Sequence, residues 1–439
     1  MAIAAASLPL VRAAPGYDPW TWLLWGREVA GGGLSTVGGP AFKPLPVAIC
    51  ALLAPLGGAA PWLWVALVRA AAVAACWLAF RLGRRLADGS GAAGVLAAAA
   101  VALCGGFALQ AAVGGEAPLL LAFALAGAEA WRAGRTRTAL ACGVACALLR
   151  VEAWPFLLVA AAVAWRRHPH VRMMVPALAV LVPAAWFVPE WIGSGDPLRS
   201  GARALEPAVG GGPAGALASL EAAASLVLWP LWIGLLAAGR AARPLLAAGA
   251  AWILLVAAMA QAGFSGEPRY LLPGAALLAI AGVAGLARGW SDLTSYMTVN
   301  SYHPLTHTPY MRVVTPILAL LLATAAAPRL ADVPALRDAQ AHQWALARDL
   351  GAAVDAAGGR SMVLACGTPY VGPLRGPLMA YRLRVSKRMV EPDAVPRAPG
   401  VVFRARLTAA SPPAPETAAP FEPAARVGEW EVLASCAQN

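Results

Sequence analysis

The chain has 439 residues, of which 60% are hydrophobic and only 13% are charged, and its mean hydropathy is +0.65. This composition excludes an ordinary soluble enzyme and indicates an integral membrane protein. The net charge of +12 would suit a nucleic-acid partner, but no basic patch with interleaved aromatic residues occurs, so we expect no nucleic acid to bind.

Apolar segments recur along the first three quarters of the chain, and several approach the roughly 20 residues that a helix needs to cross a bilayer. The segment at 1–13 is short for a span and lacks the basic start and cleavage site of a signal peptide. We therefore expect either a tilted first helix or a true start further upstream. In total the sequence predicts about eleven crossings: 1–13, 61–84, 91–112, 116–132, 137–149, 153–166, 172–189, 217–238, 243–262, 270–287 and 312–327.

The loops between these segments carry opposite charges on alternate sides. One set of loops is rich in arginine: Arg81, Arg84, Arg85, Arg132, Arg135, Arg137, Arg166, Arg167, Arg172, Arg240, Arg243, Arg288 and Arg312. The other set holds nearly all of the carboxylates: Asp18, Glu28, Glu116, Glu152, Glu190, Asp196, Glu206 and Glu267. Because arginine-rich loops stay in the cytoplasm, we expect a multi-pass protein of the bacterial cell membrane with a cytoplasmic N-terminus. The alternation requires that 137–166 form two short helices.

Residues 1–329 are predicted to form one transmembrane domain with two long outer loops, at 14–60 and 190–216. The first of these loops contains three tryptophans beside other apolar residues, a pattern typical of a segment that lies in the membrane interface. An inner loop at 289–311 is polar and free of alanine, and its composition suggests no role.

Residues 330–439 are predicted to form a small extracytoplasmic α/β domain of ordinary size. Apolar positions within 336–354 are spaced for one face of a helix, and the proline-rich stretch at 411–420 is expected to be a loop. Three short apolar runs predict strands: 362–366, 401–405 and 430–434. The cysteines Cys366 and Cys436 are candidates for a disulfide in an oxidising compartment, with two free buried thiols as the alternative.

The first outer loop holds the densest group of residues that could carry chemistry. Asp18 follows the first apolar segment directly, where a carboxylate suits a general base that removes a proton from a sugar or lipid hydroxyl. The alternative is that Asp18 caps the helix predicted at 19–29, which begins with proline. Arg27, Glu28 and Lys43 lie in the same loop.

Two further outer turns contain ionisable residues close to the membrane. Glu116 precedes Ala-Pro in a very short loop and is either an acidic site residue or a helix cap. Arg150 and Glu152 flank a tight turn, where they either pair with each other or leave Arg150 to bind a phosphate through its planar guanidinium.

The last short outer loop repeats this pattern with Glu267, Arg269 and Tyr270. Lys43 is one of only two lysines in the chain and lies among prolines that stiffen the loop, so it is either solvated or part of a site. If Lys43, Arg150 and Arg269 converge, they form a site for an anionic head group.

These segments together resemble the GT-C superfamily of membrane glycosyltransferases. The resemblance rests on an aspartate directly after the first helix, a long first outer loop, an acidic residue in the next outer loop and an outer C-terminal domain. More narrowly, the segments Asp18-Pro-Trp-Thr-Trp, Lys43-Pro-Leu-Pro, Arg150-Val-Glu-Ala-Trp-Pro and Glu267-Pro-Arg-Tyr are similar to a group of actinobacterial integral membrane proteins placed near that superfamily.

The resemblance implies transfer of a hexosyl or pentosyl group from a polyprenyl-phosphate donor to a glycan, lipid or protein acceptor of the cell envelope. Asp18 then matches the base that activates the acceptor. Glu116 matches the second acidic position, which binds a divalent metal in some members and assists the acceptor in others, so the resemblance implies that Asp18 and Glu116 are the catalytic residues. Because Glu116 has no paired acid, we expect neither a metal nor another cofactor.

Lys43, Arg150 and Arg269 would stabilise the leaving polyprenyl phosphate, because fixed positive charge favours the negative charge that develops there. The remaining polar residues of these loops are expected to support the site: Arg27, Glu28, Glu152, Glu267 and Tyr270.

Two other functions use similar parts. A transporter or lipid flippase also needs many helices and charged residues, but it usually shows internal repeats with broken helices at matching positions, and we find no convincing repeat. A non-catalytic envelope scaffold that presents the outer domain would tolerate replacement of Asp18.

Overall fold

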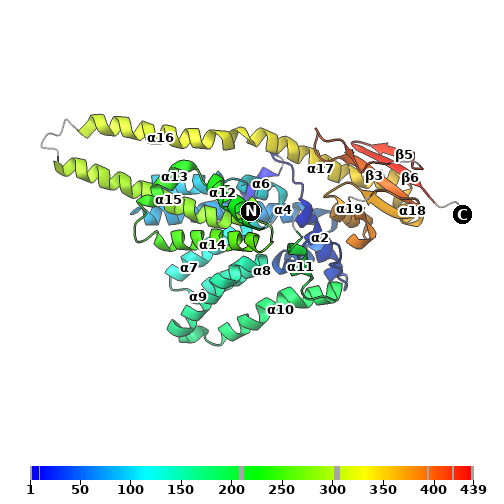
Figure 1. Cartoon of the computed structure of the whole chain (residues 1–439), viewed down its shortest axis with the longest axis horizontal. Coiled ribbons are helices and arrows are strands. Elements are labelled where there is room, and N and C mark those ends of the chain that lie inside the picture. The colour runs from blue at the N-terminus through cyan, green and yellow to red at the C-terminus, as the bar shows by residue number, and fades with distance from the viewer. Residues whose placement is uncertain are drawn as a thin grey trace.

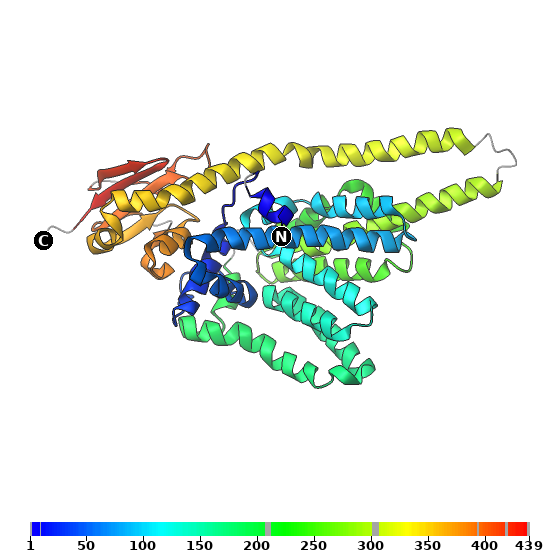
Figure 2. The same cartoon turned by 180° about the vertical axis from the view of Figure 1, so that it is seen from behind.

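The computed structural model describes residues 2–8, 10–206, 212–300, 307–392, 395–417 and 420–436. A bundle of helices forms one end of the molecule, and a small sheet with three helices forms the other (Figure 1). Helix α16 (His307–Ala331) runs along the bundle and α17 (Val333–Ala356) continues from it to the sheet (Figure 2). The predicted mainly helical fold with a small C-terminal α/β part is confirmed.

The bundle consists of short and medium helices that are rich in alanine and leucine. Proline occupies one of the first two positions in eight of these helices, where its missing N–H group has no helical partner to lose. The helices are α1 (Ala2–Ser7), α2 (Tyr17–Ala30), α3 (Pro44–Leu53), α4 (Ala60–Leu86), α5 (Gly91–Ala102), α6 (Phe107–Val113), α7 (Ala117–Arg132), α8 (Thr136–Leu149), α9 (Trp154–Arg167), α10 (Met174–Ser194), α11 (Arg199–Ala204), α12 (Pro213–Leu226), α13 (Trp229–Leu236), α14 (Arg243–Gln261) and α15 (Pro268–Asn300).

Helix α15 is the most deeply buried of the long helices in the bundle. It packs against α13 through glycines, and a Cβ atom on Gly285 would lie only 1.8 Å from the carbonyl oxygen of Gly234. Such close backbone contact is typical of helices packed inside a membrane. The first turn of this central helix therefore has a fixed position, which matters because it carries two of the predicted site residues.

The expected first span is wrong in length. Among the described residues of the segment 1–13, only 2–7 form a helix, and the next residue lies in a turn. Arg69 of α4 donates hydrogen bonds to the carbonyl oxygens of Ser7 and Val11, at 3.0 and 2.9 Å. The first bond satisfies a carbonyl group at the end of the helix, and the second satisfies one in the segment that follows. The helix itself is too short to cross a bilayer.

Two expected spans are bent, and the expected inner loop is partly helical. The span at 91–112 bends by 62° between α5 and α6, where Gly106 has a φ of 78°, and the span at 217–238 bends by 92° before Pro230. Helix α15 continues to Asn300, so the first half of the loop predicted at 289–311 is helix; residues 301–306 lie outside the described residues.

The other predicted spans coincide with helices, and the turn between α8 and α9 confirms that 137–166 forms two short helices. Within the described ranges, five helical segments are long and apolar enough to cross a bilayer, or seven if each bent pair is one span. The figure of eleven crossings and the orientation in the membrane stay predictions.

The C-terminal part contains a six-stranded sheet with the order β2-β1-β3-β6-β5, and β4 pairs with β3. Strand β1 is parallel to its two neighbours, and the pairs β3–β6 and β5–β6 are antiparallel. The strands are β1 (Thr368–Val371), β2 (Glu391–Pro392), β3 (Gly400–Arg406), β4 (Pro413–Ala414), β5 (Glu422–Val427) and β6 (Trp430–Ser435), and the flanking helices are α17, α18 (Gly359–Cys366) and α19 (Gly376–Leu383).

Two of the three predicted strands are confirmed as β3 and β6, but the strand predicted at 362–366 is wrong. This segment is the end of α18, and the chain becomes extended only after Gly367, whose φ is 143°. A run of five apolar residues fits either a buried strand or a buried helix, so its pattern alone does not distinguish them. The loop predicted at 411–420 contains the short strand β4. The domain boundary at residue 330 stays a prediction.

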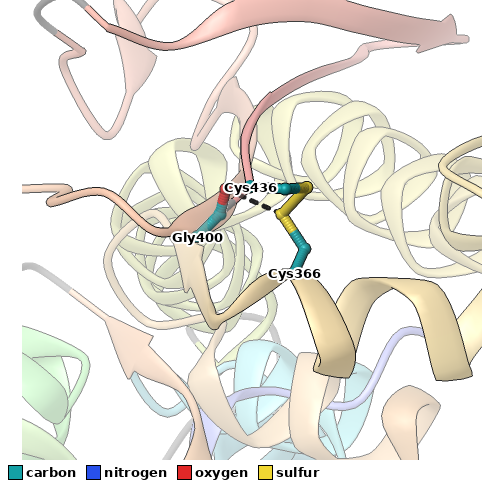
Figure 3. Close-up of a disulfide and its surroundings, with 3 residues drawn as sticks. All are labelled: Cys366, Gly400 and Cys436. Carbon is teal, nitrogen blue, oxygen red and sulfur yellow. Dashed lines mark hydrogen bonds between the residues drawn. A yellow bond between two sulfur atoms is a disulfide. The ribbon is translucent and has the colours of Figure 1, made fainter. Parts of the chain in front are cut away.

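Cys366 and Cys436 form a disulfide that joins the end of α18 to the end of β6 (Figure 3). The sulfur of Cys366 also lies 3.5 Å from the carbonyl oxygen of Gly400 in β3. Of the two alternatives left open by the sequence, the disulfide is the one observed. The five free cysteines all lie in the helical bundle: Cys50, Cys76, Cys104, Cys142 and Cys146.

Candidate active site

Asp18 lies in the first turn of α2 and does not cap this helix. Gly16 occupies the cap position, and no side chain bonds the free N–H groups there. The Oδ2 atom of Asp18 instead accepts a hydrogen bond from Nη1 of Arg269 at 3.0 Å and lies 4.0 Å from Nζ of Lys43. The alternative role of Asp18 as a helix cap is therefore wrong, and its carboxylate is available for a site.

Lys43 is the residue before α3, and its ammonium group points into the protein. Its side chain is only 12% exposed, so the alternative of a solvated lysine is wrong. Nζ donates a hydrogen bond to Oε1 of Glu116 at 2.5 Å and lies 5.2 Å from the ring centre of Trp22. Trp22 is one turn after Asp18 on the same face of α2. The sequence predicted it as one of the tryptophans of the membrane interface and not as a neighbour of the site.

Glu116 precedes α7 and is almost completely buried. It makes no side-chain cap, and its Oε1 atom accepts hydrogen bonds from both Lys43 and Arg150, the latter at 2.9 Å. Burial alone would raise the pKa of this carboxyl group, but the charges of Lys43 and Arg150 outweigh that effect and hold its pKa below the ordinary value. Glu116 therefore carries a negative charge between two cations at neutral pH.

Arg150 occupies the turn between α8 and α9 in an extended conformation. Its guanidinium group binds both carboxylate oxygens of Glu152, and it also reaches Glu116. The Cζ atom of this guanidinium group lies 3.9 Å from the centre of the Tyr270 ring. Of the two arrangements considered from the sequence, the pairing of Arg150 with Glu152 is observed. That Arg150 binds a phosphate stays a prediction.

Arg269 is in the first turn of α15 and lies at the most exposed edge of these charged side chains. Its Nε atom lies 2.7 Å from Oε2 of Glu267, and Nη2 donates to the hydroxyl of Tyr270 at 3.2 Å. The side chains of Arg269 and Glu267 are 30% and 38% exposed, compared with 11% for Asp18. A ligand would therefore approach from the side of Arg269 and Glu267.

Together these side chains form what we call the Asp18 cluster. Carboxylates and cations alternate along it, so that each cation lies between two carboxylates. An entering anion would have to compete with those carboxylates for the cations at the open edge. Both contacts that Asp18 makes within the described part of the chain go to Oδ2, which leaves Oδ1 to accept a proton. The members are Asp18, Lys43, Glu116, Arg150, Glu152, Glu267, Arg269 and Tyr270.

Arg27 and Glu28 were predicted to support this site, but the structure does not bring them to the cluster. Arg27 donates a 2.6 Å hydrogen bond to the carbonyl oxygen of Tyr381 in α19. Its guanidinium carbon lies 4.8 Å from the centre of the Tyr381 ring. Glu28 accepts a hydrogen bond from the backbone N–H of Ser35 at 3.0 Å. These two residues connect α2 to the C-terminal part and to the loop after α2.

No three His, Cys, Asp or Glu side chains that could hold a metal gather anywhere in the described residues. Whether the protein uses a divalent metal stays a prediction. Two cavities, of about 690 and 230 Å³, lie between α5, α15 and α16, and none of the cluster residues lines them.

No protein-family model and no curated protein matches the chain. Among solved structures, the chain is similar to ArnT from Cupriavidus metallidurans bound to undecaprenyl phosphate, with a TM-score of 0.56 and 16% identity. The match covers 98% of this chain and 96% of that one. The apo state of the same protein gives a TM-score of 0.56 at 15% identity and covers 98% of this chain and 95% of that one. The chain therefore shares its fold with this membrane protein over nearly the whole length of both chains, as the sequence analysis had predicted.

Proposed function

We propose that the protein is a membrane glycosyltransferase that moves a sugar from a polyprenyl-phosphate donor to an acceptor in the cell envelope. The observation that carries this proposal is the position of Asp18, a carboxylate held between Arg269 and Lys43 at the open edge of a buried charged cluster. A base directly beside two cations is what transfer from a phosphate leaving group requires. The likeness in fold to a protein that binds undecaprenyl phosphate supports the same donor class.

In this mechanism the acceptor hydroxyl lies against Oδ1 of Asp18. Asp18 takes the hydroxyl proton as the acceptor oxygen forms a bond to the anomeric carbon of the donor sugar. The bond between that carbon and the phosphate oxygen breaks, and the phosphate keeps the electron pair. The products are the glycosylated acceptor, polyprenyl phosphate and a protonated Asp18.

The cations have separate tasks in this proposal. Arg269 and Lys43 are nearest to Asp18, so they meet the phosphate as it gains negative charge. Arg150 is deeper and bonded to two carboxylates, so it acts mainly by fixing Glu116, which in turn holds Lys43. Fixed cations of this kind stabilise the developing charge without rearranging during the reaction.

The proposal requires that the Asp18 cluster and the sheet lie on the outer side of the membrane. Both occur at the same end of the molecule, because α19 packs directly on α2 (Figure 2). The disulfide supports an oxidising compartment for that end, since such bonds are rare in the cytoplasm.

A transfer assay tests the proposal. Purified protein would be incubated with a set of labelled polyprenyl-phosphate sugars and membrane acceptors, using wild type, Asp18→Asn and the control Asp196→Asn. Asp196 is an exposed carboxylate of another outer loop, so its replacement should leave transfer unchanged. We expect label transfer by wild type and the control only, and equal transfer with a chelator present.

Equal transfer by Asp18→Asn would remove the proposed base. If wild type transfers no sugar from any donor but moves the lipid across vesicle membranes, the flippase alternative would replace the transferase.

A further inference from the structure

A second buried charged site lies beside the Asp18 cluster, where α10 ends. Glu190 is completely buried although it lies in the last turns of an apolar helix. Arg199 binds both of its carboxylate oxygens, with Nε at 2.7 Å and Nη2 at 2.8 Å. The hydroxyl groups of Thr36 and Ser200 complete the site with hydrogen bonds of 3.1 and 2.7 Å to the same carboxylate.

This site holds one particular segment, residues 34–43, which we call the Lys43 loop. Arg199 donates hydrogen bonds to the carbonyl oxygens of Gly39 and Pro40 at 3.1 and 2.9 Å. The backbone N–H of Phe42 donates to the hydroxyl of Ser200 at 2.7 Å. A loop without a helix or strand needs such partners for its buried backbone groups. Residues of the second outer loop thus supply hydrogen-bond partners for the backbone of the first outer loop.

The Lys43 loop also packs closely against the end of α10. The N–H of Thr36 donates to the carbonyl oxygen of Gly193 at 3.1 Å, and a Cβ atom on Gly193 would lie 2.9 Å from the side chain of Thr36. Glycine is the residue that allows this approach. The last residue of the Lys43 loop is Lys43 itself, whose ammonium lies between Glu116 and Asp18.

We propose that Glu190 and Arg199 are positioning residues, which hold the Lys43 loop so that Lys43 stays between Asp18 and Glu116. A buried carboxylate is costly unless it is paired, and Arg199 pairs with Glu190 within one segment of the chain. The hydrogen bonds of this pair reach the Lys43 loop, and Thr36 and Glu190 are 154 residues apart in sequence. Displacement by about 1 Å is enough to impair a site that works by fixed charges. The effect on catalysis rests on the proposed function, whereas the effect on the loop does not.

The two lysines of the chain report on the position of this loop. Lys43 ends it, and Nζ of Lys387 lies 3.7 Å from where a Cβ atom on Gly38, near its tip, would be. Both lysines are largely shielded from solvent. Release of the Lys43 loop should therefore increase the reaction of both amines with an acylating reagent, which mass spectrometry measures at each position.

The experiment compares the full-length protein in lipid nanodiscs with Arg199→Gln and with Arg203→Gln. Arg203 pairs with Glu206 on the surface of the same segment, so it is a matched control. We expect acylation of both lysines to be roughly tenfold faster in Arg199→Gln, which is less than the full loss of a buried charge pair would produce, and unchanged in Arg203→Gln.

Gly193→Ala is a second variant that keeps both charges, so a general failure to fold is excluded if it has the same effect. It displaces Thr36 sterically, and alanine is otherwise well tolerated in a helix. Wild-type acylation rates in both Arg199→Gln and Gly193→Ala would overturn the inference.

Sugar transfer measured on the same samples separates this inference from the proposed function. We expect a lower kcat in both variants, restored in part by Arg199→Lys. Faster acylation with unchanged transfer would show that the loop is held for another reason and would overturn the positioning role. If wild type transfers no sugar, the acylation rates still decide whether Glu190 and Arg199 hold the loop, and only the proposed function fails.

Discussion

Replacement of Arg150 by methionine removes the cation that two buried carboxylates share. Arg150 and Glu152 are 7% and 5% exposed, and the guanidinium also binds Glu116. After the change Glu116 keeps Lys43, but Glu152 loses its cationic partner and becomes an unpaired buried charge. Breaking a buried ion pair in this way costs about 3–5 kcal/mol, and we expect a loss of this size in the free energy of unfolding.

A double variant shows where this loss comes from. Arg150→Met with Glu152→Gln removes both charges of the pair, so the penalty for the unpaired carboxylate disappears. We expect it to recover about 2 kcal/mol or more of the loss, because replacing both partners of a buried pair is often nearly neutral. The remaining loss reflects Glu116 and the contact with Tyr270.

Unfolding in mixed detergent micelles, followed by the fluorescence of the 17 tryptophans, measures these free energies. Arg203→Met is the control, since its pair is exposed and should contribute less than about 1 kcal/mol. The reasoning would be refuted if Arg150→Met cost no more than this control, or if the double variant were as unstable as the single one.

Three further predictions follow from the same contacts. Burial raises the pKa of Glu116, but its two cationic neighbours lower that pKa by more, so the net pKa is below the ordinary value. The charge of Glu116 therefore stabilises the fold above about pH 4.5, and this stabilisation is lost as the pH falls below that value. The difference in unfolding free energy between wild type and Glu116→Gln should therefore shrink on acidification from about pH 6 to about pH 3, and a constant difference would contradict the predicted linkage. Joint replacement of Cys366 and Cys436 by serine opens a link across 70 residues and should cost up to about 4 kcal/mol in the C-terminal part; reducing agent should destabilise wild type equally and leave the variant unchanged. Arg27→Ala removes a charged hydrogen bond to α19 and should speed amide hydrogen exchange in that helix by about tenfold, whereas exchange at the wild-type rate would show that other contacts hold it.

The parts of the fold that the sequence predicted are those set by local apolar length. Helices α4, α7, α8, α9 and α14 follow from apolar segments bounded by arginine or proline, and α8 was separated from α9 by charge alternation alone. The bends within two expected spans depend on how neighbouring helices pack, which local hydropathy does not contain. The strand predicted at 362–366 failed because five apolar residues suit either conformation.

The members of the Asp18 cluster were recognisable in the sequence because each is an ionisable residue beside an apolar segment. The sequence did not show that these side chains contact one another, because Asp18 and Arg269 are 251 residues apart. Arg27 was assigned to the site because it is near Asp18 in sequence. It is nine positions further along α2, however, and at about 100° per residue this places it on the opposite face of the helix. Glu190 was counted only as one more outer carboxylate.

The most direct test of the central claim measures binding and transfer by Asp18→Asn in the same preparation. Asparagine removes the charge opposite Arg269, so polyprenyl phosphate should bind with an equal or lower Kd than in wild type. Transfer should fall by about a thousandfold, as expected for loss of a general base. Transfer at the wild-type rate by a variant that still binds the lipid would contradict the account, and loss of binding together with transfer would show that Asp18 only maintains the structure of the site.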